Sequence, residues 1–235
     1  MAELQAPLDR LVSAHYSGAR GESYTSYQLA AADVRARVAA RKFAPHVRPT
    51  DTVVDFGCGP GHVLARLDVA QRIGVEPNPH TRSLAEAAGV HTVERTTQLP
   101  PESADVVISH HALEHTLSPF EELCALLTVL RPIGRLALVV PVDDWRVQRQ
   151  PDPNDINHHL FTWTPRLLYN LLSEAGYRVG GCRVVRRTLP GRLTEPLGQR
   201  LPDRAFEAVM GLTAVVRCRP ELHALAWPDP AASTG

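Results

Sequence analysis

Short apolar runs alternate with helix-like segments through the middle of the chain, and polar or glycine-rich positions separate them. Such alternation is typical of βα units and predicts a parallel sheet within an α/β fold. The predicted strands, in chain order, are Thr52–Phe56, Arg72–Glu76, His91–Val93, Asp105–Ser109, Arg135–Pro141, Tyr177–Val185 and Leu212–Cys218.

Two helices between these strands have clear start signals. Ser118 is a predicted N-cap, with Pro119 in the first turn and Glu121 completing a capping box. Thr164-Pro165 begins the second helix, and Gly176 ends it. The predicted buried positions are Phe120, Leu123, Leu127 and Leu130 in the first helix and Leu168, Leu171, Leu172 and Ala175 in the second.

Three segments lie outside the predicted sheet: residues 1–50, 142–163 and 186–211. We expect the first to form a helical cap and the other two to be lid insertions in a domain spanning 51–220, with 221–235 as a tail. In open α/β sheets such segments gather over the carboxyl ends of the strands, where ligands bind.

Composition limits the classes of partner. The 235 residues are 44% hydrophobic, enough for a sizeable core, and 25 basic residues balance 25 acidic ones. No overall field therefore draws the chain to nucleic acid or to a membrane surface. Four scattered cysteines without a C-x-x-C pair, and a start (MAELQAPLDR) without a secretory signal or an apolar span, favour a cytoplasmic protein.

A glycine loop, Asp55-Phe-Gly57-Cys58-Gly59-Pro60-Gly61, follows the first predicted strand and leads toward a helix. Glycines at this spacing let the backbone approach a ligand closely. A dinucleotide loop would have glycine where His62 stands, and the G-K-[ST] of a P-loop is absent. Glu76, at the end of the second strand, is placed to accept both hydroxyls of a ribose. These features indicate a nucleoside-containing cofactor without a pyrophosphate.

The ordered series VVDFGCGPG, IGVEPN, Leu99-Pro100, ADVVIS, LEH and LRPIGRLALVVP resembles class I S-adenosylmethionine-dependent methyltransferases over roughly residues 50–185. The resemblance implies a Rossmann-like, seven-stranded, mostly parallel sheet with helices on both faces, an antiparallel last strand and S-adenosyl-L-methionine across the first strands. It also implies cofactor-binding roles for Asp55, Gly57, Cys58, Gly59 and Gly61 at the methionine part, Glu76 and Asn78 at the ribose, Thr96, Thr97 and Gln98 at the adenine, and Ser109 and His110 at the sulfonium.

Two positions depart from the family pattern, and several residues have simpler interpretations. Many relatives carry an acid at the adenine where this chain has Arg95-Thr96-Thr97, and Arg131-Pro-Ile133-Gly134 stands where two glycines are common. The glycine loop could be a tight turn, and Cys58 could be a packing residue. The last open question concerns Tyr16, Tyr24 and Tyr27, which either close over the cofactor or substrate or pack within the cap.

Residues 109–119, SHHALEHTLSP, contain the pattern H-x-x-E-H at His111, Glu114 and His115. On a helical turn, positions i, i+3 and i+4 share a face, so the three side chains can converge on a metal. In zinc peptidases this pattern lies within a longer helix, whereas here a strand precedes it and a capped helix follows. The peptidase reading is therefore disfavoured, and a purely structural turn remains an alternative.

A second resemblance concerns this cluster. Ubiquinone-pathway O-methyltransferases and small-RNA 2'-O-methyltransferases have E-x-x-E-H here, and the RNA branch takes a further histidine from a stretch similar to His159-Leu-Phe161-Thr-Trp163-Thr164. The resemblance implies a divalent metal held by His111, Glu114, His115 and His159, with Zn, Fe, Mn or Ni favoured over Mg by the imidazoles. His158 is the alternative to His159.

Without a metal, His111 or His159 is a candidate general base. Asp143, Asp144 and Trp145 either contact the substrate or cap a lid. We therefore expect an S-adenosylmethionine-dependent O-methyltransferase of a small-molecule hydroxyl, with the residues of the four-membered cluster as catalytic candidates. A metal-dependent RNA 2'-O-methyltransferase is the alternative, opposed by the neutral charge and the 6% aromatic content. A nucleotide-binding oxidoreductase or a non-catalytic cofactor-binding partner are alternatives of another class.

Overall fold

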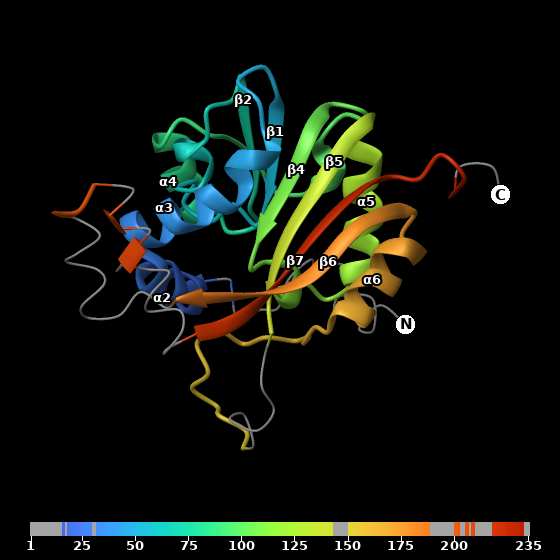
Figure 1. Cartoon of the computed structure of the whole chain (residues 1–235). Helices are drawn as coiled ribbons and strands as arrows, with labels where there is room; N and C mark the ends of the chain where they lie inside the picture. The colour runs from blue at the N-terminus through green and yellow to red at the C-terminus, as the bar shows by residue number, and fades with distance from the viewer. Residues whose placement is uncertain are drawn as a thin grey trace, which may run out of the picture.

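A seven-stranded sheet with helices on both faces forms the body of the molecule (Figure 1). The computed structural model describes residues 16, 18–29, 32–142, 150–188, 200–202, 205–206, 208–209 and 218–232. The α/β fold class predicted from the alternating pattern is confirmed. None of the helices within these ranges combines the length and the apolar character needed to cross a membrane.

The strands are ordered β3-β2-β1-β4-β5-β7-β6 across the sheet. β7 runs antiparallel to both of its neighbours, and the other pairings from β3 to β5 are parallel, as expected. The strand bounds are β1 Thr52–Phe56, β2 Gln71–Val75, β3 His91–Val93, β4 Ala104–His110, β5 Leu130–Pro141, β6 Tyr177–Thr188 and β7 Cys218–Pro228.

Two hydrophobic cores lie between the sheet and its helical layers. α3 (Ala32–Phe43) and α4 (Pro79–Ala87) cover one face, and α5 (Pro119–Val129) and α6 (Pro165–Glu174) cover the other (Figure 1). α2 (Gly18–Leu29) lies against α4, where the hydroxyls of Thr25 and Thr81 are 2.8 Å apart. The described residues from 18 to 46 are thus helical, and the division of the chain into a cap and a core domain stays a prediction.

The start signals of α6 are confirmed, but those of α5 are confirmed only in part. The Thr164 hydroxyl accepts a hydrogen bond from the Leu167 N–H at 3.2 Å. Ser118 holds the N-cap position of α5, yet its side chain makes no capping hydrogen bond. The predicted stripe of α5 was also wrong at Phe120, which is 41% exposed. The buried residues of α5 are Pro119, Leu123, Leu126 and Val129, which are three or four positions apart and share one helix face. Phe120 lies outside this face.

Two expectations about the chain path were wrong. The glycine loop leads into a single 3-10 turn, η3 (Leu64–Arg66), because few residues separate the loop from β2. The last strand is β7 at 218–228, whereas the sequence predicted a strand at 212–218 and a tail over 221–235; residues 212–217 lie outside the described ranges. β7 alternates, since Leu222, Ala224 and Ala226 are buried on one core.

Parts of the two expected lid insertions are described. Residues 201 and 206 approach α3, where Arg37 donates a hydrogen bond to the Leu201 carbonyl at 3.3 Å and lies 4.8 Å from the Phe206 ring. In the other insertion, residues 150–163 lead into α6. Asp143, Asp144 and Trp145 lie outside the described residues.

Candidate active site

A cavity with about 750 Å³ of empty volume, its open mouth included, lies at the carboxyl ends of β1, β2 and β4. The lining residues include Gly57, Gly59, Glu76, Asn78, Glu94, Arg95 and Thr96 on one side, and Tyr16, Tyr24, His111, Ala112 and His115 on the other.

The glycine loop shapes the first wall of the cavity. Gly57, Gly59 and Gly61 all have positive φ angles, of 74°, 52° and 77°, which favour glycine. The N–H groups of Gly57 and Cys58 both donate to the Val75 carbonyl, at 2.9 and 3.1 Å, and fix the loop to β2. A Cβ atom on Gly57 would collide with the β-carbon of Ala112. Gly57 therefore allows the turn after β4 to pack directly on the loop.

Glu76 lies at the end of β2 and lines the cavity. Its Oε2 accepts a hydrogen bond from the Gly59 N–H at 3.2 Å, and its Oε1 accepts one from the Asn78 N–H at 2.9 Å. Burial raises the pKa of the Glu76 carboxyl to about 7, although these hydrogen bonds and Arg82 act in the opposite direction. Both carboxylate oxygens are thus oriented by backbone groups at the cavity wall.

Asn78 joins the cavity wall to the N-terminal segment. Its Oδ1 caps α4 by accepting hydrogen bonds from the N–H groups of His80 and Thr81, at 2.9 and 3.3 Å. Its Nδ2 donates to the Tyr16 carbonyl at 3.1 Å. One side chain therefore fixes both the helix start and the residue that approaches from the cap.

Several predicted cofactor residues lie behind the cavity and do not line it. Ser109 donates to the Phe56 carbonyl at 2.9 Å and ties β4 to β1. Cys58 packs its sulfur against Gly74, where a Cβ would collide with it, which agrees with a packing residue. Burial, with a smaller contribution from Glu76, raises the pKa of Asp55 well above its ordinary value. These side chains support the glycine loop on the side away from the cavity.

The turn after β3 differs from the prediction in detail. Thr97 and Gln98 do not line the cavity, whereas their neighbours Glu94, Arg95 and Thr96 do. The Gln98 Oε1 atom accepts hydrogen bonds from the N–H groups of Glu94 and Arg95, at 2.8 and 2.9 Å. Gln98 therefore shapes the turn, and its neighbours face the cavity.

The H-x-x-E-H segment does not form the helical turn that would join all three polar residues. Only η5 (Leu113–His115) is helical, as a 3-10 turn, and His111 has a positive φ of 54°. Because a left-handed residue interrupts the helical geometry, His111 turns away from Glu114 and His115. The expected convergence of His111 on the metal cluster was thus wrong.

The other three predicted metal ligands do lie together. Glu114 is fully buried, and its Oε1 atom is 3.8 Å from His115 Nε2. The rings of His115 and His159 are 5.0 Å apart, and one donor atom from each of the three residues lies within 4.8 Å of the others. The Leu160 N–H donates to the Glu114 carbonyl at 2.9 Å, which holds the His159 loop beside η5.

Tyr16 closes this side of the cavity. Its hydroxyl shares a hydrogen bond of 2.6 Å with His115 Nδ1 and also contacts the Asn157 carbonyl oxygen. Its ring meets Tyr24 edge to face at 5.0 Å. Burial raises the pKa of the Tyr16 hydroxyl, so it stays protonated and available as a donor. The side chain of Tyr27 lies outside the described residues.

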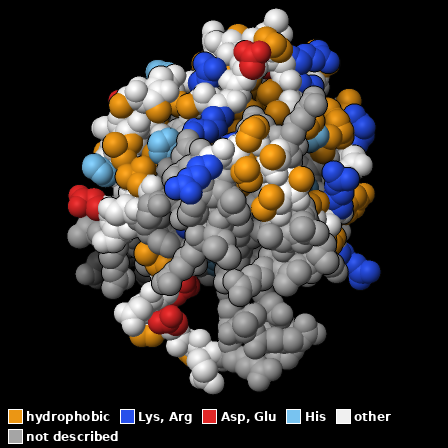
Figure 2. Space-filling view, turned by 60° about the vertical axis from the view of Figure 1, so that its left-hand side comes forward, with side chains coloured by type: hydrophobic (Ala, Val, Ile, Leu, Met, Phe, Trp, Pro, Cys, Tyr) orange, Lys and Arg blue, Asp and Glu red, His pale blue; other side chains and the backbone are white. Residues whose placement is uncertain are grey.

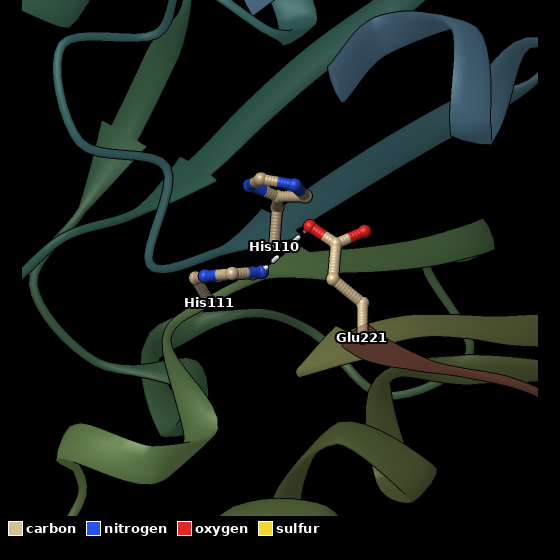
Figure 3. Close-up of side chains that lie close together, drawn as sticks. All are labelled: His110, His111 and Glu221. Carbon is tan, nitrogen blue, oxygen red and sulfur yellow. Dashed lines mark hydrogen bonds and ion pairs between the residues drawn. The ribbon is translucent and has the colours of Figure 1, made fainter. Parts of the chain in front are cut away.

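His111 contacts a residue that the sequence analysis did not select. Its Nε2 atom lies 3.1 Å from Oε1 of Glu221 on β7, and its ring stacks on His110 at 4.5 Å (Figure 3). His110 does not line the cavity, whereas His111 does. Glu221 was assigned to the tail, although the alternation of Leu222, Ala224 and Ala226 is a strand signal that would have placed it in the sheet.

Comparisons with known proteins identify the family of the chain. Residues 24–180 match the model of a family described as a methyltransferase domain. A curated relative, a tRNA U34 carboxymethyltransferase from Hahella chejuensis, is 35% identical over 44% of this chain and 37% of its own length. The chain therefore matches only a little over a third of that relative.

Two solved structures share the fold at low sequence identity. A chain from the complex between the Haloferax volcanii Trm112 methyltransferase activator and a methyltransferase has a TM-score of 0.66 at 17% identity, covering 88% of this chain and 95% of that one. An S-adenosylmethionine-dependent methyltransferase from Thermotoga maritima has a TM-score of 0.59 at 16% identity, covering 88% and 94%. This chain belongs to the methyltransferase domain family and has the fold of class I S-adenosylmethionine-dependent methyltransferases.

Proposed function

We propose that this protein transfers the methyl group of S-adenosyl-L-methionine to a hydroxyl of a small molecule, with His111 as general base. The observation that carries the proposal is that a single cavity is lined by the glycine loop and Glu76 on one side and by His111 and His115 on the other. A donor and an acceptor bound there would be neighbours, and proximity supplies much of the catalysis in a methyl transfer.

The residues at the cavity fit the cofactor. Glu76 presents two oxygens suited to a ribose diol, and Gly57 and Gly59 line the cavity where the methionine part would lie against the backbone. Asn78 would lie beside the ribose, and the 94–96 turn would border the adenine. This wall would be supported from behind by Asp55, Cys58, Gly61 and Ser109, and the 94–96 turn would be held by Gln98. The bound cofactor would supply an activated methyl group.

His111 would take the proton of the acceptor hydroxyl. It follows the end of β4 and lines the same cavity, so it lies on the acceptor side of the cofactor wall. A histidine with a pKa near neutrality is suited to this task at physiological pH. Tyr16 and Tyr24 would close the cavity above the reacting groups and exclude water.

We expect His111→Ala to lower turnover by about 10²- to 10⁴-fold, because it removes a general base. Transfer of a labelled methyl group to a panel of hydroxyl compounds measures the turnover, and calorimetry with S-adenosylhomocysteine measures cofactor affinity, which we expect to persist. His91→Ala, at an exposed histidine of the edge strand β3, is the matched control. Undiminished turnover in His111→Ala would contradict the assigned role, and a wild-type protein that binds cofactor without turnover would be a non-catalytic partner.

A metal-dependent RNA 2'-O-methyltransferase is a second candidate, favoured by one specific observation. The donor atoms of Glu114, His115 and His159 lie together as a divalent metal would require. The similarity to a tRNA U34 carboxymethyltransferase gives RNA further support. Against it, Lys and Arg side chains on the face in Figure 2 are scattered among hydrophobic ones, without a continuous basic track over the described residues.

Metal removal distinguishes the two candidates. Under the main proposal, chelator-treated protein keeps its activity on small hydroxyl compounds, and elemental analysis finds no stoichiometric transition metal. Under the second, His115→Ala loses about one metal per chain and its activity on short RNA, while cofactor affinity falls no further than in Tyr16→Phe, because His115 contributes to the cluster and bonds to Tyr16 but is not part of the cofactor wall. Membership of the methyltransferase family leaves the oxidoreductase alternative without support.

A further inference from the structure

Glu221 is a fully buried carboxylate beside the proposed acceptor site. It lies near the start of β7, paired with Pro141 of β5 and Val185 of β6. Its Oε1 accepts hydrogen bonds from Lys42 Nζ at 2.8 Å and His111 Nε2 at 3.1 Å, and its Oε2 accepts them from Lys42 Nζ at 2.7 Å and His223 Nε2 at 3.2 Å.

We propose that Glu221 is a positioning residue that fixes the tautomer of His111 and stabilises its protonated form, so that the acceptor is an acidic hydroxyl of a phenol or an enol. The proposal rests on the function proposed above, since it assigns the acceptor class of that same site. Figure 3 shows how the Glu221 carboxylate and the His111 ring approach each other from β7 and from the end of β4.

The hydrogen bonds define which nitrogen of His111 is basic. A carboxylate only accepts hydrogen bonds, so His111 Nε2 must carry the hydrogen that it shares with Glu221. In the neutral ring, Nδ1 is then the nitrogen with a lone pair, and His111 lines the cavity. The His111 N–H donates to the Val139 carbonyl at 2.8 Å and holds the backbone at its positive φ. A strained residue held in this way is common at functional sites.

Lys42 balances the charge of the buried carboxylate. Burial acts to raise the pKa of Glu221, but hydrogen bonds from His111 and His223 and the Lys42 ammonium hold it well below its ordinary value. Lys42 Nζ also lies 3.0 Å from His110 Nε2, and an ammonium can only donate, so His110 is neutral with its hydrogen on Nδ1. Glu221 is therefore ionised, and a neutral ring stacks on His111.

The same contacts argue against a metal at this cluster. His110, His111 and Glu221 bring one donor atom each within 4.8 Å of one another, which is the spacing of a metal site. The ammonium of Lys42, however, is already bound to both Glu221 oxygens and to His110 Nε2. A metal would need these same donor atoms, so the cluster is organised for a proton and not for a metal ion.

The proton and the charge can be followed through the proposed step. The hydroxyl oxygen forms a bond to the methyl carbon while the methyl–sulfur bond breaks with its electron pair on sulfur. The hydroxyl proton goes to Nδ1 of His111, so the positive charge of the sulfonium ends on an imidazolium that is hydrogen-bonded to Glu221. Because Glu221 makes His111 more basic than an ordinary histidine, of pKa about 6.5, this base is better matched to a hydroxyl such as a phenol, of pKa about 10, than to an aliphatic alcohol.

Histidine NMR of the full chain, labelled with ¹⁵N, tests the pair without any substrate. We expect the neutral form of His111 in the wild type to carry its hydrogen on Nε2. We also expect the pKa of His111 to be higher in the wild type than in Glu221→Gln. The groups around its ring among the described residues are His110 of β4, Glu221 and His223 of β7, and Lys42 of α3. Glu174→Gln, an exposed carboxylate of α6, is the matched control and should leave His111 unchanged.

Turnover of acceptor panels tests the chemistry. We expect phenols and enols to be methylated and aliphatic alcohols not, with kcat about 10- to 100-fold lower in Glu221→Gln and affinity for S-adenosylhomocysteine kept. The acid limb of the pH profile of kcat/KM should move to lower pH in this variant, because His111 loses the carboxylate that stabilises its protonated form.

The outcomes separate the two proposals. An Nδ1–H tautomer of His111 in the wild type overturns the role of Glu221, even if hydroxyl methylation is found. This measurement uses the wild type alone, so it can be made even if Glu221→Gln does not fold. Preferred turnover of aliphatic alcohols overturns the acceptor class. The absence of methyl transfer to any hydroxyl overturns the proposed function itself, whichever tautomer is observed.

Discussion

Glu76 combines burial with two backbone hydrogen bonds, and its protonation changes near neutral pH. With a pKa raised to about 7, the carboxyl is partly protonated in the ligand-free protein at physiological pH. A ribose diol needs an ionised acceptor, so proton release would accompany cofactor binding. In the ligand-free protein, the folded state keeps this proton to higher pH than the unfolded state does. The contribution of Glu76 to the free energy of unfolding is therefore lost as the pH rises from 4.5, the ordinary pKa of the carboxyl, toward 7.

We therefore expect affinity for S-adenosylhomocysteine to weaken about tenfold between pH 8 and pH 6, since protonation of Glu76 competes with binding. Calorimetry across this range measures the effect. Glu76→Gln should bind weakly at every pH and lose this dependence. Affinity of the wild type that stays constant over the same range would contradict the role given to Glu76.

At the scale of single residues, the glycine loop could be predicted because its positive φ angles fix the residue type, and the cofactor-binding roles stay predictions. Gly57, Gly59, Glu76 and Asn78 were predicted at the cofactor and do line the cavity. His111 was grouped with Glu114 and His115 because its spacing fits a helix. Its positive φ depends on the tertiary contact with Val139 and on no local signal, so the sequence could not reveal it.

The turn after β4 and the glycine loop are coupled elements. Gly57 meets Ala112 directly, whereas a Cβ on Gly89, which also has a positive φ of 82°, would meet nothing within 4 Å. Substitution at Gly89 thus imposes only backbone strain, of about 1 kcal/mol. Substitution at Gly57 adds a collision that must displace one of the two elements.

We expect Gly57→Ala to lower the free energy of unfolding more than Gly89→Ala does, and to abolish cofactor binding. Adding Ala112→Gly to Gly57→Ala should raise the free energy of unfolding to about that of Gly89→Ala, because it removes the colliding β-carbon. Denaturant unfolding of the four variants gives the coupling energy. Additive effects of Gly57→Ala and Ala112→Gly would show that the contact is unimportant.

At the scale of elements, the predicted parallel strands were confirmed because their apolar runs and following turns are local features. β7 was misplaced because its inward side, with Leu222, Ala224 and Ala226, is small, while the outward Glu221 and His223 read as polar surface. Glu221 pairs with Lys42 of α3, a long-range partner that the local sequence does not show. Glu221 was missed as a site residue because the strand that carries it was misplaced.

The whole molecule closes its cavity with segments far apart in the sequence. Tyr16 from the N-terminal region meets His115 after β4 and the Asn157 carbonyl of the loop before α6. The Asn78 side chain holds the Tyr16 backbone from the opposite wall. Cap, cofactor wall and acceptor side thus meet at one residue.

We expect Tyr16→Phe to weaken affinity for S-adenosylhomocysteine by about 2- to 10-fold while the fold is kept, because it removes the hydroxyl that bonds to His115 and to the Asn157 carbonyl. Faster dissociation should account for most of this change, because the variant loosens the closure and leaves the cofactor wall intact. Stopped-flow displacement measures the rate. An unchanged dissociation rate would show that Tyr16 only packs the cap.

The central claim is that one cavity brings an S-adenosylmethionine methyl group and a small-molecule hydroxyl together beside His111. The most direct measurement is transfer of labelled methyl from S-adenosylmethionine to the oxygen of phenolic acceptors by chelator-treated protein, with wild type and His111→Ala compared. We predict a labelled methyl ether from the wild type and its loss from the variant at unchanged cofactor affinity. Label that enters only RNA, or an equal yield from the two proteins, would contradict the account.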